Sequence, residues 1–240
     1  MGLGDTIKTT TLAAAITLAL VLQGTAQGQP PMRIHTKTKA QELELTPAKV
    51  SLSGGKVKQR ATDATVDISA NGIPDHAVGQ FPIRGNPNRI QAQKYRLSTD
   101  ARQLPDVARA LGGAGLSGIA VNGVPFDPGV AEFRKGNPRS GWQYEALARA
   151  VPLGLDQNHA HVQLNGAYHY LGLPVGLMQQ LGWSAQKPSQ LIGYADDGFP
   201  IYAIIATVDG TLREMTSSYQ LKFGNRPGGR LPGGRYDGAL

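Results

Sequence analysis

Cysteine is absent from the 240 residues of this chain. Its absence excludes disulfide bonds, thiolate metal sites, cysteine nucleophiles and lipidation at a cysteine. Stability must therefore come from packing, or from packing together with a metal held by nitrogen and oxygen ligands. Histidine is also scarce, with five residues in all, and three of them are close together in sequence. The histidines are His35, His76, His159, His161 and His169.

Several chemical motifs are missing as well. The chain has no Gly-x-Ser-x-Gly nucleophile elbow, no phosphate-binding glycine loop and no His-Glu-x-x-His. Serine hydrolases, nucleotide-binding proteins and ordinary metalloproteases are therefore disfavoured. Lys and Arg total 24 against 17 for Asp and Glu, a net charge of +7, which permits an anionic cell-envelope surface as a partner. The basic residues are scattered rather than clustered, so we do not expect nucleic-acid binding.

The chain has only one sustained apolar run, which lies near its amino end. Lys8 precedes the apolar stretch 12–22, and Gly24-Thr25-Ala26 then gives the small-x-small pattern that signal peptidases accept. A membrane span needs roughly 20 apolar residues, so this run is too short for an anchor. We predict a signal peptide over residues 1–26, cleaved after Ala26. The mature protein is then periplasmic or secreted, with no transmembrane segment.

The rest of the chain divides by composition into two parts. Residues 27–60 are polar and Lys-rich, and they read as a linker with a possible edge strand near Val50 and Leu52. Residues 61–240 read as one domain. Within it, the Gly- and Pro-rich stretch 224–235 has too few apolar groups to fold alone.

Short apolar runs joined by turn dipeptides dominate this domain. Asn71-Gly72 follows one such run, and Asn122-Gly123 and Asp197-Gly198 each separate two of them. All three dipeptides predict hairpins, because Gly favours the positive φ of tight turns. Short helices are expected only at Trp142–Val151 and Gly176–Leu181. The predicted fold is mainly β, a hairpin-rich antiparallel sheet or sandwich with a few short helices, and α+β is the alternative.

The three clustered histidines lie on an expected hairpin whose register decides their geometry. If Asn165-Gly166 were a two-residue turn, His169 would point away from the other two. If residues 164–166 form a three-residue loop with Gly166 in the left-handed conformation, His161 opposes His169 and all three histidines share one face. Directly opposed β-carbons are about 4.5 to 5.5 Å apart, close enough for imidazoles to converge on one ion.

Three imidazoles with an open coordination position suit zinc or copper, since no thiolate is available. His76 is a possible further ligand contributed through the fold. The first hypothesis is thus a metal-binding protein. The second is a metal-dependent hydrolase or oxidase, which needs a carboxylate within about 8 Å of the histidines; Glu145 and Asp196 are the candidates. The third is a structural or interaction protein without a metal.

The chain resembles the bacterial YHYH-domain family in six blocks that occur in order. This resemblance implies an exported bacterial protein with a site near these blocks. The blocks are Asn158–Gln163 with Asn165–Tyr170, Asn71–His76, Asn122–Pro128, Trp142–Leu147, Gly193–Tyr202 and Ser217–Lys222.

Two features depart from that family pattern. The signature Tyr-His-Tyr-His reads Tyr168-His169-Tyr170-Leu171 here, so the last histidine is replaced by Leu171. In the three-residue-loop register this position opposes His159, and the site could be weakened, opened or abandoned. The family pattern also continues beyond residues 236–238, which leaves a short branch and an incomplete chain as alternatives.

Overall fold

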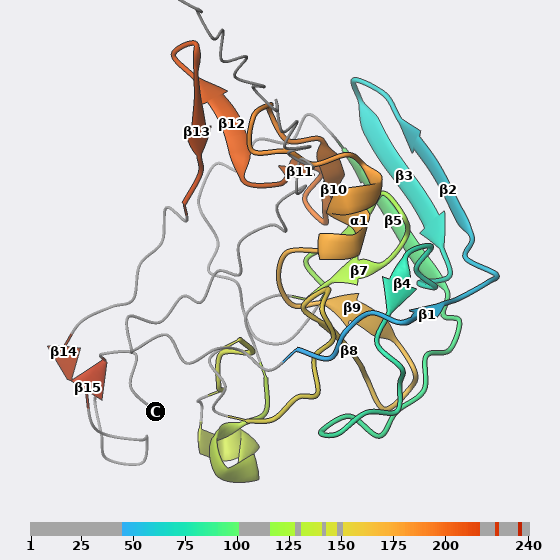
Figure 1. Ribbon diagram of the computed structural model, residues 1–240, viewed down its shortest axis with the longest axis vertical. Coiled ribbons are helices and arrows are strands. Elements are labelled where there is room, and N and C mark those ends of the chain that lie inside the picture. Colours follow the sequence, from blue (N-terminus) through green and yellow to red (C-terminus); the bar gives the residue numbers. More distant parts are fainter. Residues whose placement is uncertain are drawn as a thin grey trace, which may run out of the picture.

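The computed structural model describes residues 45–100, 116–127, 131–140, 143–147, 151–216, 224–225 and 235–236. These residues form a mainly β structure of several sheets whose strands are mostly antiparallel, with one short α-helix (Figure 1). The predicted fold class is confirmed. No helix in these ranges is long and apolar enough to cross a bilayer. The predicted signal peptide, 1–26, lies outside the described residues.

The largest sheet has six strands in the order β11-β10-β6-β7-β9-β8. All neighbouring pairs are antiparallel except β7 and β9, which run parallel with Phe126 beside Tyr170. The histidine hairpin therefore forms one edge of this sheet. The strands are β6 (Gly118–Ala120), β7 (Pro125–Phe126), β8 (Ala160–Val162), β9 (Tyr168–Tyr170), β10 (Leu191–Ala195) and β11 (Pro200–Tyr202).

Two of the three predicted turn dipeptides make hairpins in this sheet. Asn122-Gly123 connects β6 to β7 and Asp197-Gly198 connects β10 to β11. Gly123 and Gly198 have φ values of 82° and 91°. Both lie in the left-handed region that glycine adopts without steric cost, which is why these turns were visible in the sequence.

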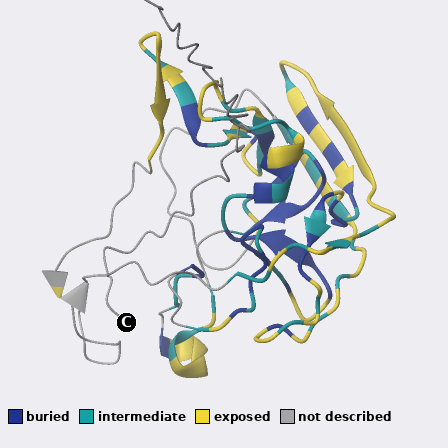
Figure 2. Cartoon of the chain, viewed as in Figure 1, coloured by how far each residue is buried: buried dark blue, intermediate teal, exposed yellow. Residues whose placement is uncertain are grey.

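A three-stranded sheet, β2 (Val57–Ala61), β3 (Thr65–Ala70) and β5 (Tyr95–Asp100), packs beside the large one. β3 alternates strictly, with Val66, Ile68 and Ala70 buried and the intervening residues exposed, as the striped strand in Figure 2 shows. The buried stripe contacts Ile119 of β6. One face of this sheet is thus closed by the core, and the other is open.

The prediction of a hairpin at Asn71-Gly72 is wrong. β3 pairs with β2 and β5, and not with the strand that follows Gly72. The Asn71 side chain accepts a hydrogen bond from the Lys56 amide and donates one to the Gly54 carbonyl. These contacts tie Asn71 to the preceding loop, so the chain leaves the sheet instead of folding back.

The smaller elements include one confirmed helix and one that is missing. Helix α1 (Val175–Gln180) lies where Gly176–Leu181 was predicted. In contrast, the described part of Trp142–Val151 contains no helix, because Gln143 forms a β-bridge with Phe133. The other elements are β1 (Val50–Ser51) with β4 (Ala77–Val78), β12 (Ile205–Val208) with β13 (Thr211–Glu214), β14 (Gly224–Asn225) with β15 (Arg235–Tyr236), and the 3-10 helices η1 (Arg134–Gly136) and η2 (Pro138–Ser140).

The main core lies between the six-stranded sheet, α1 and the segment that precedes β5. Val50 and Leu52, from the predicted linker, pack against this core. The predicted edge strand is present as β1 and β2, and β2 crosses the predicted boundary at residue 60. The buried residues of this core are Val78, Ala120, Val124, Phe126, Ala160, Val162, Tyr168, Tyr170, Leu177, Met178 and Ile192.

Candidate functional site

The histidine hairpin adopts the register of a three-residue loop. His161 is the direct partner of His169. Two backbone hydrogen bonds close the loop. The Gln163 N–H donates to the Ala167 carbonyl at 2.9 Å, and the Gly166 N–H donates to the Gln163 carbonyl at 2.9 Å. Gly166 has a φ of 84°, the left-handed value that this loop requires. The predicted loop is confirmed.

The register places the rings of His161 and His169 together. Their centroids are 4.7 Å apart and their planes meet at 79°, an edge-to-face contact. The residues that alternate with them, including Tyr168 and Tyr170, point to the opposite face and enter the main core. His161 is half-buried, whereas His169 is only 2% exposed. The face of the hairpin that points away from the main core therefore carries a close imidazole pair, of which His169 is buried.

His159 does not extend this pair as predicted. Its φ of 52° is left-handed, and it lies before β8, in a turn that its N–H closes by donating to the Asp156 carbonyl. Its carbonyl still accepts the Leu171 N–H at 2.8 Å, but a left-handed residue does not continue the strand alternation. The His159 ring makes no ring contact with His161 or His169 within the described residues. In the described ranges, no three His, Asp or Glu side chains are arranged to hold a metal.

His76 lies on the other face of the hairpin. Its Nε2 is 2.5 Å from the Tyr170 hydroxyl and its Nδ1 is 2.9 Å from the Ala77 carbonyl. Since Tyr170 and His169 are adjacent strand residues, they point to opposite sides of the sheet. The structure therefore does not bring His76 to the imidazole pair.

All three hairpin histidines are held in the same tautomer. Nδ1 of His159 faces the Leu173 carbonyl at 2.8 Å, Nδ1 of His161 faces the Leu153 carbonyl at 3.3 Å, and Nδ1 of His169 faces the Ala167 carbonyl at 3.5 Å. A carbonyl only accepts hydrogen bonds, so each Nδ1 carries the proton and each Nε2 presents a lone pair.

Two of these lone pairs are buried. Nε2 of His159 and Nε2 of His169 have no hydrogen-bond partner among the described residues. Buried polar atoms are nearly always paired in folded proteins, and an exception calls for an explanation such as an ion or a water. An imidazole whose Nδ1–H is fixed by a backbone carbonyl is also the usual orientation of a metal-binding histidine.

The environment keeps this pair uncharged. Burial, and secondarily the charge of nearby His161, lowers the pKa of His169 from 6.5 to about 3. Burial also lowers the pKa of His161, against the opposing effects of the Leu153 carbonyl and the carboxylates of Glu132 and Asp156. Both imidazoles are therefore neutral at pH 7, the protonation state that binds metals.

The predicted carboxylates are placed very differently. Glu145 lies in a segment whose neighbour Leu147 packs with Leu171, on the same side of the hairpin as the imidazole pair, and its Oε2 is buried. Asp196 is exposed at the β10–β11 turn. β10 is separated from β9 by β6 and β7, which puts Asp196 roughly 14 Å away at about 4.8 Å per strand. This distance excludes Asp196 from direct chemistry with the pair.

Glu132 was not expected from the sequence, yet it lies near the pair. The Glu132 carbonyl accepts the Tyr144 N–H at 3.1 Å, which joins its segment to the one that carries Glu145. Glu132 itself is exposed and close enough to His161 to raise its pKa. Nothing in its local sequence marks it, because its position depends on contacts between residues distant in the chain.

Asp156 is the most important buried residue that the sequence did not reveal. It is fully buried and accepts hydrogen bonds from the Tyr168 hydroxyl at 2.8 Å and the Gly79 N–H at 2.9 Å. It also accepts from the Asn158 N–H at 2.9 Å and the Asn158 amide at 3.2 Å. The Asp-x-Asn spacing just before the hairpin was its only local signal, one typical of an Asx turn.

A second buried network surrounds Tyr170. Its hydroxyl contacts His76 and accepts from the Asn122 amide at 3.0 Å, and Asn122 also reaches Asp75 at 3.2 Å. Burial raises the pKa of Tyr168 and of Tyr170 well above 10, so both phenols stay neutral. The two tyrosines thus anchor the hairpin to the core, while His169 between them faces away from it.

The comparisons with known proteins bear on the same segment. A family model described as YHYH protein matches residues 94–239, which is more than half of the chain. The chain belongs to the YHYH protein family. No curated protein and no solved structure matched it. The YHYH match begins just before β5, so the strands β1 to β4 precede the matched region, while the hairpin, α1 and the Asn122-Gly123 turn lie within it.

Proposed function

We propose that this YHYH protein binds a divalent transition metal, zinc or copper, at the imidazole pair His161–His169. The observation that carries the proposal is the buried Nε2 of His169, which has no hydrogen-bond partner in the described residues and belongs to a ring in contact with that of His161. Leaving such a nitrogen desolvated and unpaired costs roughly 1–3 kcal/mol, which a bound ion would offset.

The available ligands favour these two metals. Two neutral imidazoles, an exposed carboxylate near His161 from Glu132 and water form a nitrogen and oxygen donor set. Imidazole suits zinc and copper, whereas magnesium and calcium prefer all-oxygen sites. His159 has the same tautomer and an equally unpaired Nε2, so it is the candidate third ligand.

Metal titration of the full chain, purified without a His tag, tests this function. Isothermal titration with Zn²⁺ and Cu²⁺ should show one saturable site, and Cu²⁺ electron paramagnetic resonance should show coupling to two nitrogens. H161Q and H169Q should each weaken binding at least about tenfold. H159Q decides whether the site has two or three imidazoles.

His76→Gln is the matched control for these variants. It replaces a histidine on the opposite face of the hairpin and leaves an amide that can bond the Tyr170 hydroxyl. Its metal affinity should equal that of the unaltered protein. The proposal fails if neither metal binds, or if H169Q binds as tightly as H76Q.

The proposal includes export to the periplasm or the medium. It is supported by Lys8, the apolar stretch 12–22 and the small residues ending at Ala26, and a chain without cysteine is insensitive to thiol redox conditions. Amino-terminal sequencing of protein from the native host's extracytoplasmic fraction should begin at Gln27. Recovery of the intact chain only from the cytoplasm would contradict this part of the proposal.

A further inference from the structure

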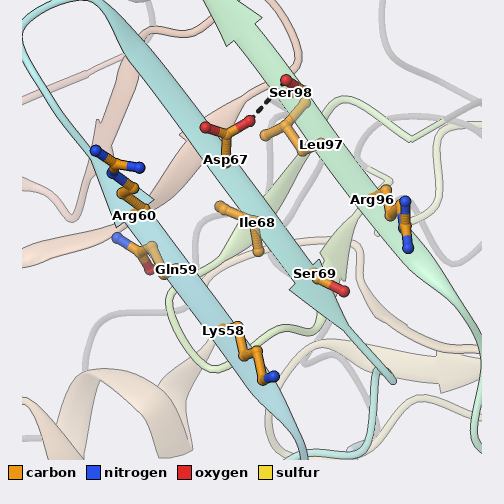
Figure 3. A pocket seen from close by; sticks show the side chains of 9 residues that line it. All are labelled: Lys58, Gln59, Arg60, Asp67, Ile68, Ser69, Arg96, Leu97 and Ser98. Carbon is orange, nitrogen blue, oxygen red and sulfur yellow. Dashed lines mark hydrogen bonds between the residues drawn. The ribbon is translucent and has the colours of Figure 1, made fainter.

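The outer face of the β2–β3–β5 sheet contains an open depression of about 430 Å³ (Figure 3). The inner face of this sheet is closed by the buried stripe of β3. Six of the nine residues that line the depression have the opposite parity and are exposed, and Gln59, Ile68 and Leu97 form the row between them. Figure 3 shows these side chains on three adjacent strands. The six residues of the exposed parity are Lys58, Arg60, Asp67, Ser69, Arg96 and Ser98.

The strand register orders these residues in two rows. One row runs Lys58, Ser69, Arg96 across the three strands, because Ser69 is the direct partner of both neighbours. Adjacent strands are about 4.8 Å apart, so the two cations lie on either side of a hydroxyl with their Cα atoms roughly 10 Å apart. Lys58 and Arg96 have long flexible side chains, so both can reach one oxyanion placed above Ser69.

The second row runs Arg60, Asp67, Ser98. The Ser98 hydroxyl donates to Asp67 at 2.7 Å, which fixes the carboxylate. The depression therefore combines three cations with one carboxylate and two hydroxyls. The cations can bind an acidic group of a ligand. The carboxylate and the serine hydroxyls can form hydrogen bonds with neutral hydroxyls beside that group.

The chemistry of the lining selects among anionic partners. Among the residues that the structure describes, no aromatic side chain lines the depression, whereas sheet surfaces that bind single-stranded nucleic acid stack bases on aromatics. Three basic residues attract an anionic membrane by only about 1 kcal/mol each, and the lining has no large apolar side chain projecting outward for insertion. Asp67 would repel a chain that carries a charge on every unit, but it can accept a hydrogen bond from a sugar hydroxyl.

We propose that this face binds an acidic glycan, with a sugar carboxylate between Lys58 and Arg96 and sugar hydroxyls bonded to Ser69 and Asp67. The proposal does not depend on the metal site, since these residues belong to a different sheet. An acidic glycan is one chemical class of the anionic cell-envelope partner that the net charge permits.

Binding of a hyaluronan oligosaccharide of defined length, in which only every second sugar carries a carboxylate, to the full chain tests this proposal, with a neutral oligoglucan as the comparison ligand. Saturable binding to the acidic oligomer alone is expected, and it should weaken as salt is raised. The triple variant K58S/R60S/R96S should lose at least about tenfold in affinity. All three positions are exposed, so its melting temperature should match that of the unaltered chain.

A second triple variant, R139S/K187S/R213S, is the matched control. It removes the same number of positive charges from exposed positions outside the depression, and its affinity should stay within about twofold. The proposal is overturned by absent saturable binding, by equal losses in the two triple variants, or by equal affinity for single-stranded DNA or for anionic phospholipid vesicles.

Discussion

At the scale of single residues, the side chains of the signature Tyr168-His169-Tyr170 lie on two opposite faces of one strand and have different roles. The tyrosines enter the core, where their hydroxyls bond to Asp156 and to His76 and Asn122. The histidine between them joins His161 outside the core. Strand alternation explains this division, because neighbouring side chains point in opposite directions.

The pH dependence of stability should report on His169. Its pKa in the folded state is lowered to about 3 from 6.5, so the unfolded chain binds a proton in this interval and the folded chain does not. The free energy of unfolding should therefore be highest above pH 6.5 and fall as the pH drops toward 3, by up to about 1.4 kcal/mol per pH unit from this residue. Urea denaturation at several pH values measures the slope.

H169Q is the comparison for this measurement. Glutamine does not titrate, so the variant should show a smaller loss of stability between pH 6.5 and 4 than the unaltered protein. Burial also lowers the pKa of His76, His159 and His161, so part of the slope should remain. An identical slope in H169Q would show that His169 is not held neutral.

Asp156→Ala should be among the most destabilising single substitutions. It removes the acceptor of the Tyr168 hydroxyl and the Gly79 N–H in a fully buried site, and each donor left unpaired costs about 1–3 kcal/mol. We expect a loss of about 2–4 kcal/mol in the free energy of unfolding. Asp67→Ala, at an exposed position, should cost less than about 1 kcal/mol.

At the scale of elements, the loop 164–166 fixes the site because it sets the register of β8 against β9. Gly166 is left-handed, and a Cβ there would lie 2.6 Å from the Cβ of Gln91. The loop is thus specified twice, by its backbone conformation and by its contact with the chain before β5. A register shifted by one residue would separate His161 from His169.

Gly166→Ala should therefore cost more than an ordinary left-handed glycine. Gly210 is the matched control, since its φ is 75° but no atom of the described part of the chain lies within 4 Å of an added Cβ. We expect Gly210→Ala to cost about 1 kcal/mol from backbone strain alone. Gly166→Ala should cost at least about 1 kcal/mol more, because the clash is added. Chemical denaturation compares them, and equal losses would contradict a tight contact at Gln91.

At the scale of the whole molecule, the family match covers less than the folding unit. Residues 94–239 match the family, yet Val50, Leu52, Val78 and Phe81 pack against the main core and β3 pairs with β5 along its full length. Gly79 also donates to Asp156, at the base of the hairpin. The segment before the match is therefore part of the structure that holds the site.

A fragment of residues 94–240 should fail to fold cooperatively, whereas 45–240 should retain the transition of the longer chain. Losing the earlier segment exposes the buried surface of the main core and leaves β5 without its partner. Thermal unfolding followed by circular dichroism, with hydrogen exchange at Tyr168 and Tyr170, measures this. A cooperative transition in the shorter fragment would show that the matched region folds alone.

Features that depend on neighbouring residues could be predicted from the amino-acid sequence. Asn-Gly and Asp-Gly dipeptides specified two hairpins, and Gly166 specified the three-residue loop, because positive φ is a local preference of glycine. The pairing of His161 with His169 followed from that loop. The tertiary structure alone decided the left-handed turn at His159, the placement of His76 on the opposite face and the burial of Asp156. These features depend on contacts between segments far apart in the chain, whose geometry local preferences do not encode.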